Sequence, residues 1–216
     1  MTTPLPPASQ DETAGTVPQV FIVDDDPAIR KSLAMMIQAH GLATMQYASA
    51  EEFLAEYNVS QPGCMVLDLR MPGMTGEELL KTLRQGGSDI PVVILTGHGD
   101  VPVAVRTMKL GVVDFLQKPA EHQILIDALR SALHKDVERR LVEADQQKLL
   151  KRMSRLTPRE RELLAMLAAG KTSKEIASVL TVSVKTVDNH RAHLLAKLDA
   201  SNVAELAALA VRAGLG

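Results

Sequence analysis

Between residues 20 and 134 the chain alternates short apolar runs with stretches of helical periodicity. The apolar runs begin near Val20, Ala43, Cys64, Val92 and Val112. The helical stretches cover residues 27–40, 49–57, 75–86, 101–110 and 121–134. This alternation is typical of βαβ units and predicts an α/β fold with a doubly wound, five-stranded parallel sheet. The third and fourth runs are continuously apolar, as strands covered by helices on both faces should be.

Four polar residues each follow one of these apolar runs, namely Asp25, Asp68, Thr96 and Lys118. The carboxyl ends of parallel strands converge on the crevice where ligands bind, so we expect these side chains to lie together. A single acid or hydroxyl after a strand usually only caps the next helix. Two acids, a hydroxyl and an ammonium together predict a site for a divalent cation and a phosphoryl group.

The chemistry of these residues suits magnesium. Mg²⁺ is usually held by one or two carboxylates together with substrate oxygens and waters. Asp25 and Asp68 can supply the carboxylates, and we expect Asp24 beside the metal, directly or through water. A carboxylate can attack a phosphoryl group and form an aspartyl-phosphate, while Lys118 and the metal neutralise the donor's charge and Thr96 donates a hydrogen bond. The alternative for residues 24–26 is a solvated acidic turn, but three adjacent acids are easier to explain with a cation between them.

Four motifs resemble those of the receiver domains of two-component response regulators. They lie within residues 19–134, at 24–26, 68–76, 96–100 and 118–119. The resemblance implies a flavodoxin-like sheet, phosphorylation of Asp68 by a sensor histidine kinase, and Mg²⁺ as cofactor. It also implies that the backbone carbonyl of Arg70 is a third metal ligand and that Lys118–Pro119 is a cis peptide.

The same resemblance implies a conformational switch made by Thr96 and Phe115. A simple core aromatic is an equally compatible interpretation of Phe115. Ala120 departs from the phenylalanine that many relatives carry after the proline, which bears on local packing and not on the phosphorylation chemistry. Cys64 begins an apolar strand, so we interpret it as a small buried hydrophobe.

The two parts of the chain carry opposite net charges. Residues 151–216 contain 11 Lys and Arg against 6 Asp and Glu, a net charge of +5. Residues 1–150 contain 13 Lys and Arg against 20 Asp and Glu, a net charge of −7. This asymmetry suggests that the basic part meets a polyanion.

Capping signals predict four short helices in the basic part. Capping boxes begin at Thr157 and Thr172, and Asn202 fits a similar cap for the last helix. The second helix, to about residue 180, is followed by a turn at 181–183 and by a third helix to about residue 199. A short helix, a three-residue turn and a longer helix predict a helix-turn-helix.

The third of these helices has two distinct sides. Val187, Leu194 and Leu198 should pack inward. The opposite side carries small or polar residues, as a helix in a DNA major groove requires. These residues are Lys185, Asp188, Asn189, Ala192, His193 and Ala196.

Residues 154–216 resemble the LuxR/NarL-type DNA-binding domain, and the whole chain most resembles FixJ-type regulators. The motifs that carry this resemblance are residues 156–160, 170–177 and 183–190. Phosphate contacts that position the helix are predicted for Lys174, Lys185, Thr186, Arg191 and Lys197. Asn189 could pair with adenine, Asp188 could either accept from a cytosine amino group or repel phosphates from wrong registers, and His193 is predicted at a phosphate or the surface.

The remaining segments connect or flank the two domains. Residues 135–153 lack Gly and Pro, so a helix continuing from the receiver is expected. Its stripe of Leu133, Val137, Leu141 and Ala144 could pair two copies, but it spans under two heptads, and a solvated linker helix is the favoured interpretation. Residues 1–18 are expected to be a disordered tail. No apolar stretch suits a signal peptide or membrane span, which predicts a cytoplasmic protein without a membrane partner.

The sequence therefore predicts a two-component response regulator that binds promoter DNA and is controlled by phosphorylation of Asp68, with dimerisation of the receiver on phosphorylation. The expected partners are a sensor histidine kinase, double-stranded DNA, a second copy of the chain and RNA polymerase. The sequence leaves two alternatives open. One is a receiver that works by protein contacts without phosphorylation, and the other is a phosphotransfer enzyme. Neither is favoured. The protein is expected to hydrolyse only its own aspartyl-phosphate.

Overall fold

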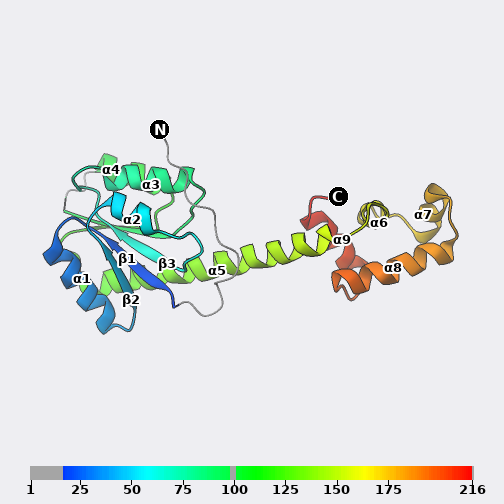
Figure 1. The fold of residues 1–216 in the computed structure, drawn as a ribbon, viewed down its shortest axis with the longest axis horizontal. Coiled ribbons are helices and arrows are strands. Elements are labelled where there is room, and N and C mark those ends of the chain that lie inside the picture. The colour runs from blue at the N-terminus through cyan, green and yellow to red at the C-terminus, as the bar shows by residue number, and fades with distance from the viewer. Residues whose placement is uncertain (1–16, 98–100, 216) are drawn as a thin grey trace. The chain divides into compact units, whose positions relative to one another are not determined.

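The computed structural model describes residues 17–97 and 101–215, which form two compact units divided between Arg140 and Leu141 (Figure 1). Most of the predicted tail at 1–18, and residues 98–100 of the motif after the fourth strand, lie outside the described residues.

The first unit is a parallel sheet of five strands in the order β2-β1-β3-β4-β5. Its strands are β1 (Gln19–Val23), β2 (Ala43–Tyr47), β3 (Gly63–Leu67), β4 (Val92–Thr96) and β5 (Asp114–Gln117). Its helices are α1 (Pro27–Ala39), α2 (Ala50–Glu56), α3 (Gly76–Gln85), α4 (Val101–Lys109) and the beginning of α5 (His122–Ser154). This strand order is that of the flavodoxin-like fold, so the predicted fold class is confirmed.

Local sequence explains where these elements begin. The Asp26 side chain accepts hydrogen bonds from the backbone N–H groups of Ala28 and Ile29, and Pro27 occupies the first turn of α1. Thr75 and Glu78 form a reciprocal capping box at the start of α3. The fifth strand begins at Asp114, two residues after its predicted start near Val112, because its pairing with β4 begins only at that residue.

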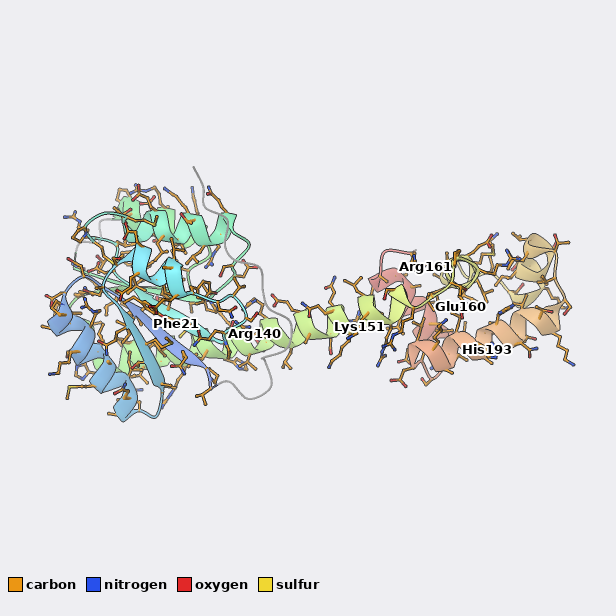
Figure 2. All side chains as sticks on the ribbon, in the orientation of Figure 1. Phe21, Arg140, Lys151, Glu160, Arg161 and His193 are labelled. Atoms are coloured by element: carbon orange, nitrogen blue, oxygen red, sulfur yellow. The ribbon has the colours of Figure 1, made fainter. Side chains whose placement is uncertain are left out.

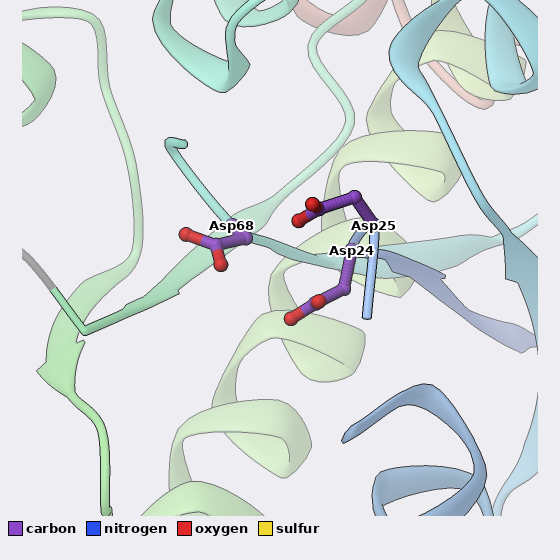
Figure 3. Close-up of side chains that lie close together, drawn as sticks. All are labelled: Asp24, Asp25 and Asp68. Carbon is purple, nitrogen blue, oxygen red and sulfur yellow. The ribbon is translucent and has the colours of Figure 1, made fainter. Parts of the chain in front are cut away.

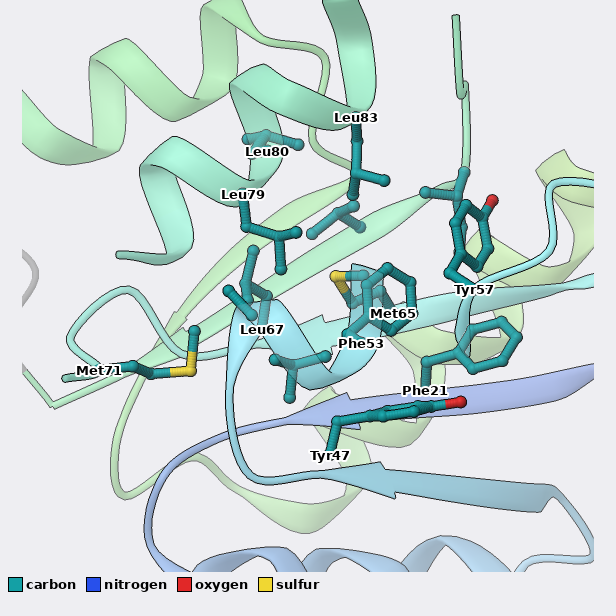
Figure 4. Packing of buried hydrophobic residues seen from close by; sticks show 14 of the residues in the cluster. Phe21, Tyr47, Phe53, Tyr57, Met65, Leu67, Met71, Leu79, Leu80 and Leu83 are labelled. Atoms are coloured by element: carbon teal, nitrogen blue, oxygen red, sulfur yellow. The ribbon is translucent and has the colours of Figure 1, made fainter. Parts of the chain in front are cut away.

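Apolar side chains cover both faces of the sheet. On one face, α2 and α3 pack over β-strand side chains around an aromatic group of Phe21, Tyr47, Phe53 and Tyr57 (Figure 4). Phe53 contacts the other three, stacking on Tyr57 with ring centroids 4.7 Å apart and meeting the other two rings edge-on.

On the opposite face, α1 and α5 pack against a mostly aliphatic group that includes Cys64. Cys64 is fully buried, and burial raises the pKa of its thiol far above the ordinary value. Its interpretation as a small buried hydrophobe is therefore confirmed. Helix α4 differs from its neighbours because Thr107 is the one buried residue among its described side chains, and the Thr107 hydroxyl donates to the carbonyls of Val103 and Ala104.

The second unit is helical. Leu149 and Met153, near the end of α5, join a core formed with α6 (Pro158–Ala168), α7 (Ser173–Leu180), α8 (Val184–Leu198) and α9 (Val203–Arg212). The predicted capping boxes at Thr157 and Thr172 and the cap at Asn202 are all present. The turn between α7 and α8 covers residues 181–183, and Thr181 there has a left-handed backbone conformation with φ 55°. The predicted helix-turn-helix is confirmed.

We expect Phe53→Ala to destabilise the first unit by about 3–5 kcal/mol, because it removes the ring that packs against the three other aromatic side chains. Both tyrosines of the chain belong to this group and the chain has no tryptophan. Urea unfolding followed by tyrosine fluorescence therefore reports on this unit alone. Met35→Ala is the matched control because Met35 is 63% exposed, and it should change stability by less than about 0.5 kcal/mol. Equal effects of the two variants would contradict the assignment of the core.

Candidate functional site

Three carboxylates lie together at the carboxyl edge of the sheet. Asp24 and Asp25 follow β1 and Asp68 follows the adjacent strand β3, and Figure 3 shows the three side chains close together. One oxygen from each residue lies within 4.8 Å of the others. Asp24 and Asp68 are buried, whereas Asp25 is exposed. The strand order thus brings the predicted acids into one group with an open side.

Lys118, which follows β5, completes this group. Its Nζ donates to Asp24 Oδ2 at 2.5 Å and to Asp68 Oδ2 at 2.6 Å. Burial alone would lower the pKa of Lys118, but its hydrogen bonds to the two carboxylates outweigh burial and raise the pKa. Burial raises the pKa of Asp24, and its hydrogen bonds from Lys118 and the Asp26 backbone only partly oppose that rise. The Lys118–Pro119 peptide is cis, as predicted.

The group of donors suits a divalent cation. With every group ionised, three carboxylates and one ammonium leave a net charge of −2, and carboxylate oxygens are the hard ligands that Mg²⁺ takes. Asp24, Asp25 and Asp68 are therefore the residues that could hold it. The backbone N–H of Arg70 donates to Asp68 Oδ1 at 3.2 Å, which places the Arg70 backbone next to the group. Coordination by the Arg70 carbonyl remains a prediction.

The backbone around Asp68 is tightly folded. A Cβ atom at Gly76 would lie 2.1 Å from the Asp68 carbonyl oxygen, so only glycine fits at the start of α3. Gly73 has φ +74°, and the neighbouring Met74 N–H donates to Glu51 Oε1 at 2.8 Å. A hydrogen bond from its own backbone, followed by this bond from Met74, lowers the pKa of Glu51. The motif from 68 to 76 is thus a folded loop that Glu51 fastens to α2.

Two residues that position the site were not predicted from the sequence. Arg30 Nη1 donates to the backbone carbonyl of Asp24 at 2.6 Å, and Glu51 fastens the loop after Asp68. Both are ordinary charged residues of amphipathic helices. Arg30 and Asp24 lie six residues apart in the chain, and Glu51 and Met74 lie 23 residues apart. No sequence motif marks either contact.

Thr96 and Phe115 lie on the neighbouring strands β4 and β5. Thr96 is fully buried at the end of β4, and its carbonyl accepts from the Lys118 backbone N–H at 2.9 Å. Phe115 is half-buried and packs against the core cluster that contains the four aromatic rings. Its interpretation as a core aromatic has this support, whereas the switch remains a prediction. Ala120 is half-buried against the aliphatic cluster.

In the second unit, α8 has the two sides that its sequence predicts. Val187, Leu194 and Leu198 are buried. The predicted outward residues are exposed, and Figure 2 labels His193 among them. They are Lys185, Asp188, Asn189, Ala192, His193 and Ala196. Helix α8 therefore presents a continuous polar and small-residue side to solvent.

Several predicted DNA contacts already have partners within the unit. Ser173 Oγ donates to Asp188 Oδ1 at 2.9 Å and accepts from Arg191 Nη1 at 2.6 Å. The hydroxyls of Thr186 and Ser183 lie 2.8 Å apart at the start of α8. Lys174, Lys185 and Asn189 are exposed.

Lys197 is paired with Glu160. Its Nζ lies 2.8 Å from Glu160 Oε2, the same oxygen that accepts from the backbone N–H and the hydroxyl of Thr157. This contact ties the end of α8 to the capping box of α6. Lys197 therefore has a structural role whether or not it also meets a phosphate.

A receiver-type sheet with this acid and lysine group, followed by a helix-turn-helix, defines the class of DNA-binding response regulators. The family described as "Response regulator receiver domain" matches residues 20–130, and "Bacterial regulatory proteins, luxR family" matches residues 154–210. The chain belongs to the response regulators that carry a LuxR-type DNA-binding domain. The predicted family is therefore confirmed.

Among its relatives are transcriptional regulatory proteins named FixJ. Those of Azorhizobium caulinodans and Rhizobium meliloti are each 42% identical to this chain. Each alignment covers 91% of this chain, together with 93% of the Azorhizobium protein and 97% of the Rhizobium protein. The solved structure of response regulator StyR has a TM-score of 0.84 at 38% identity and covers 91% of this chain and 100% of its own. Full-length FixJ from B. japonicum has a TM-score of 0.55 at 39% identity, over 93% of this chain and 99% of its own. The chain is thus a FixJ-like transcriptional regulator. Among the described residues, no helix has the length and apolar character to cross a membrane.

The Glu160 contacts predict a pH dependence of stability. The hydrogen bond from Lys197, followed by those from Thr157, lowers the pKa of Glu160 from 4.5 to about 2. The folded state therefore binds this proton more weakly than the unfolded state, and the stabilisation is present above pH 4.5 and is lost as the pH falls toward 2.

We expect Glu160→Gln to lower the melting temperature of the second unit at neutral pH and to approach the wild type below that window. Thermal unfolding of the full chain, followed by far-ultraviolet circular dichroism at several pH values, measures the difference. Glu162→Gln is the control, since it removes the same charge from the same helix without touching Lys197. A difference between wild type and Glu160→Gln that stays constant from pH 7 to pH 2.5 would show that it does not depend on the ionisation of Glu160.

Proposed function

We propose that this protein is a cytoplasmic transcription regulator whose binding to promoter DNA is controlled by phosphorylation of Asp68 from a sensor histidine kinase. The observation that carries the proposal is the contact of Lys118 with Asp24 and Asp68 at the edge where Asp25 also lies. Membership of the response regulator family supports the kinase as the phosphoryl donor. The LuxR-type unit supports DNA as the target.

In this proposal an oxygen of the Asp68 carboxylate attacks phosphorus, a new O–P bond forms, and the bond from phosphorus to the donor breaks. Mg²⁺ bound by Asp24, Asp25 and Asp68, with the Arg70 carbonyl as a further ligand, would supply charge neutralisation for the phosphoryl group. Lys118 would exchange its bond with Asp68 for one with a phosphoryl oxygen. The hydroxyl of Thr96, on the adjacent strand, would donate to another phosphoryl oxygen.

The output would follow from movement of Thr96 and Phe115 toward the modified site. Both lie on strands next to α4, where Val105 is 49% exposed and Met108 is 48% exposed. Apolar side chains exposed together on one helix suit a surface that a second copy covers. A receiver dimer would bring two helix-turn-helix units to paired half-sites on DNA, which multiplies their affinity without new base contacts.

On DNA, α8 would enter the major groove with Asn189 at a base edge and Lys185 and His193 beside it. Lys174 and Thr186 would meet phosphates near the ends of α7 and α8. Asp188 holds Ser173 and lies 3.5 Å from Arg191, which favours a role in ordering Arg191 over direct reading of cytosine.

Two other functions are less well supported. A phosphotransfer enzyme would need a second substrate site, and the remaining matched domain is a DNA-binding one. A receiver that acts by protein contacts alone would have no use for the contact of Lys118 with Asp24 and Asp68. A variant that loses phosphoryl labelling but keeps regulated DNA binding would favour the receiver that acts by protein contacts alone.

We expect Asp68→Asn to abolish Mg²⁺-dependent labelling by acetyl phosphate and the dimerisation that follows it, because the amide cannot act as the nucleophile. Labelling is measured by mass spectrometry of the intact chain and dimerisation by analytical ultracentrifugation. Asp89→Asn is the control, since Asp89 is exposed and precedes β4 at the opposite edge of the sheet. Normal labelling of the Asp68 variant would refute Asp68 as the acceptor.

We expect Asn189→Ala to lower affinity for the selected operator by about 1–3 kcal/mol and to leave nonspecific affinity nearly unchanged, because a base contact is lost. Lys185→Ala should weaken binding to both DNAs and reduce the salt slope by about one. Fluorescence anisotropy at several salt concentrations measures both quantities, after an operator is selected from random DNA. Equal losses on the two DNAs for Asn189→Ala would make it a positioning residue.

A further inference from the structure

Asp136 is a buried charge of α5 that the phosphorylation site does not use. It is 1% exposed. Its Oδ2 accepts from the backbone N–H of Gly63 at 2.9 Å and from Arg140 Nε at 2.7 Å, and its Oδ1 accepts from Arg139 Nη2 at 2.5 Å. These three hydrogen bonds, two of them from guanidinium groups, offset the cost of burying the polar side chain of Asp136.

Arg140, labelled in Figure 2, extends these contacts to the loop before β3. Its Nη1 donates to the carbonyl of Ser60 at 2.9 Å, and its Nη2 donates to the carbonyls of Val59 and Gln61 at 3.0 and 2.6 Å. A guanidinium has a rigid fork of donors, so these bonds fix its direction. We call Asp136, Arg139 and Arg140, with the backbone of residues 59–63, the α5 clamp.

The clamp extends the anchored part of α5 beyond its apolar packing. Ala132 and Leu133 are the last residues of α5 in the aliphatic cluster of the sheet. After Arg140, residues 141–148 are all exposed, and the next buried side chain is Leu149, in the core of the second unit. The helix therefore leaves the first unit at Arg140, and an uninterrupted exposed segment follows.

The clamp holds the strand that also carries the phosphoacceptor. Gly63 begins β3, every residue of that strand is buried, and Asp68 follows its last residue. The hydrogen bonds of Asp136 and Arg140 are directional, so they also set the rotation of α5 about its own axis. Apolar contacts are not directional and specify this rotation less strictly.

We propose that Asp136 and Arg140 are positioning residues for the regulatory output. They fix α5 to β3, so that the state of Asp68 reaches the DNA-binding unit through a helix of defined rotation and not through a flexible tether. This inference rests on the proposed control by phosphorylation.

Helical insertions test the proposal without touching the clamp. Two alanines inserted after Val142 rotate everything beyond them by about 200°, whereas seven alanines bring the helix back to within about 20° of its original rotation. The readout is the ratio of operator affinities with and without acetyl phosphate, measured on the full chain. We expect the seven-residue insertion to keep the ratio of the wild type and the two-residue insertion to lose it. Equal behaviour of the two insertions would overturn the proposal.

Substitution of Arg140 provides a second test. We expect Arg140→Ala to retain labelling of Asp68 and the affinity of the unphosphorylated chain for DNA, but to reduce the phosphorylation-dependent ratio by about fivefold or more. A purely structural role would instead lower labelling and melting temperature together. Lys135→Ala is the control, because Lys135 is an exposed cation of the same helix outside the clamp. An unchanged ratio in Arg140→Ala would overturn the proposal.

Failure of the proposed function would look different, because the wild type itself would show no change of DNA affinity on phosphorylation. Hydrogen exchange then tests the clamp directly. We expect the amides of residues 136–140 to be protected much more than those of 141–148, and this protection to fall in Arg140→Ala. Equal exchange of the two segments in the wild type would overturn the clamp.

Discussion

The ion pairs of Lys118 with Asp24 and Asp68 join three strands of the sheet at one point. Asp24 follows β1, Asp68 follows β3 and Lys118 follows β5. In the chain, Lys118 lies 94 residues after Asp24 and 50 residues after Asp68. Its position depends on the parallel order of the strands, and its charge allows two buried carboxylates to lie close together. Addition of charge or a phosphoryl group at Asp68 must rearrange these bonds. A chemical event at one side chain is thereby coupled to several strands.

The sequence was informative where a local signal coincides with a structural requirement. Apolar runs of strand length, caps such as Asp26 and Thr157, and glycines in left-handed turns are read directly from neighbouring residues, so the elements could be predicted to within a few positions. The grouping of Asp24, Asp25, Asp68 and Lys118 followed from the rule that parallel strands end at one edge. The fold and the grouping of these four side chains were therefore within reach of sequence reasoning.

The contacts that position these residues were beyond it. Asp136 reads as one more charge in a hydrophilic helix, and only the fold shows that it is buried against the start of β3. Arg191 and Lys197 read as free cations for DNA, yet the first is bonded to Ser173 and the second to Glu160. Such pairings depend on which helices meet, and no periodicity in the sequence encodes the partner of a given side chain.

The packing of α4 has a consequence for how the molecule can move. Among its described side chains the buried one is Thr107, whose hydroxyl is satisfied by the helix's own carbonyls. Val103 of α4 packs only half-buried against the core cluster, whereas α3 contributes three fully buried leucines to it, namely Leu79, Leu80 and Leu83. Elements with few buried apolar contacts open at a small fraction of the global unfolding free energy. Sub-global fluctuation of α4 can therefore occur while the sheet beneath it stays intact.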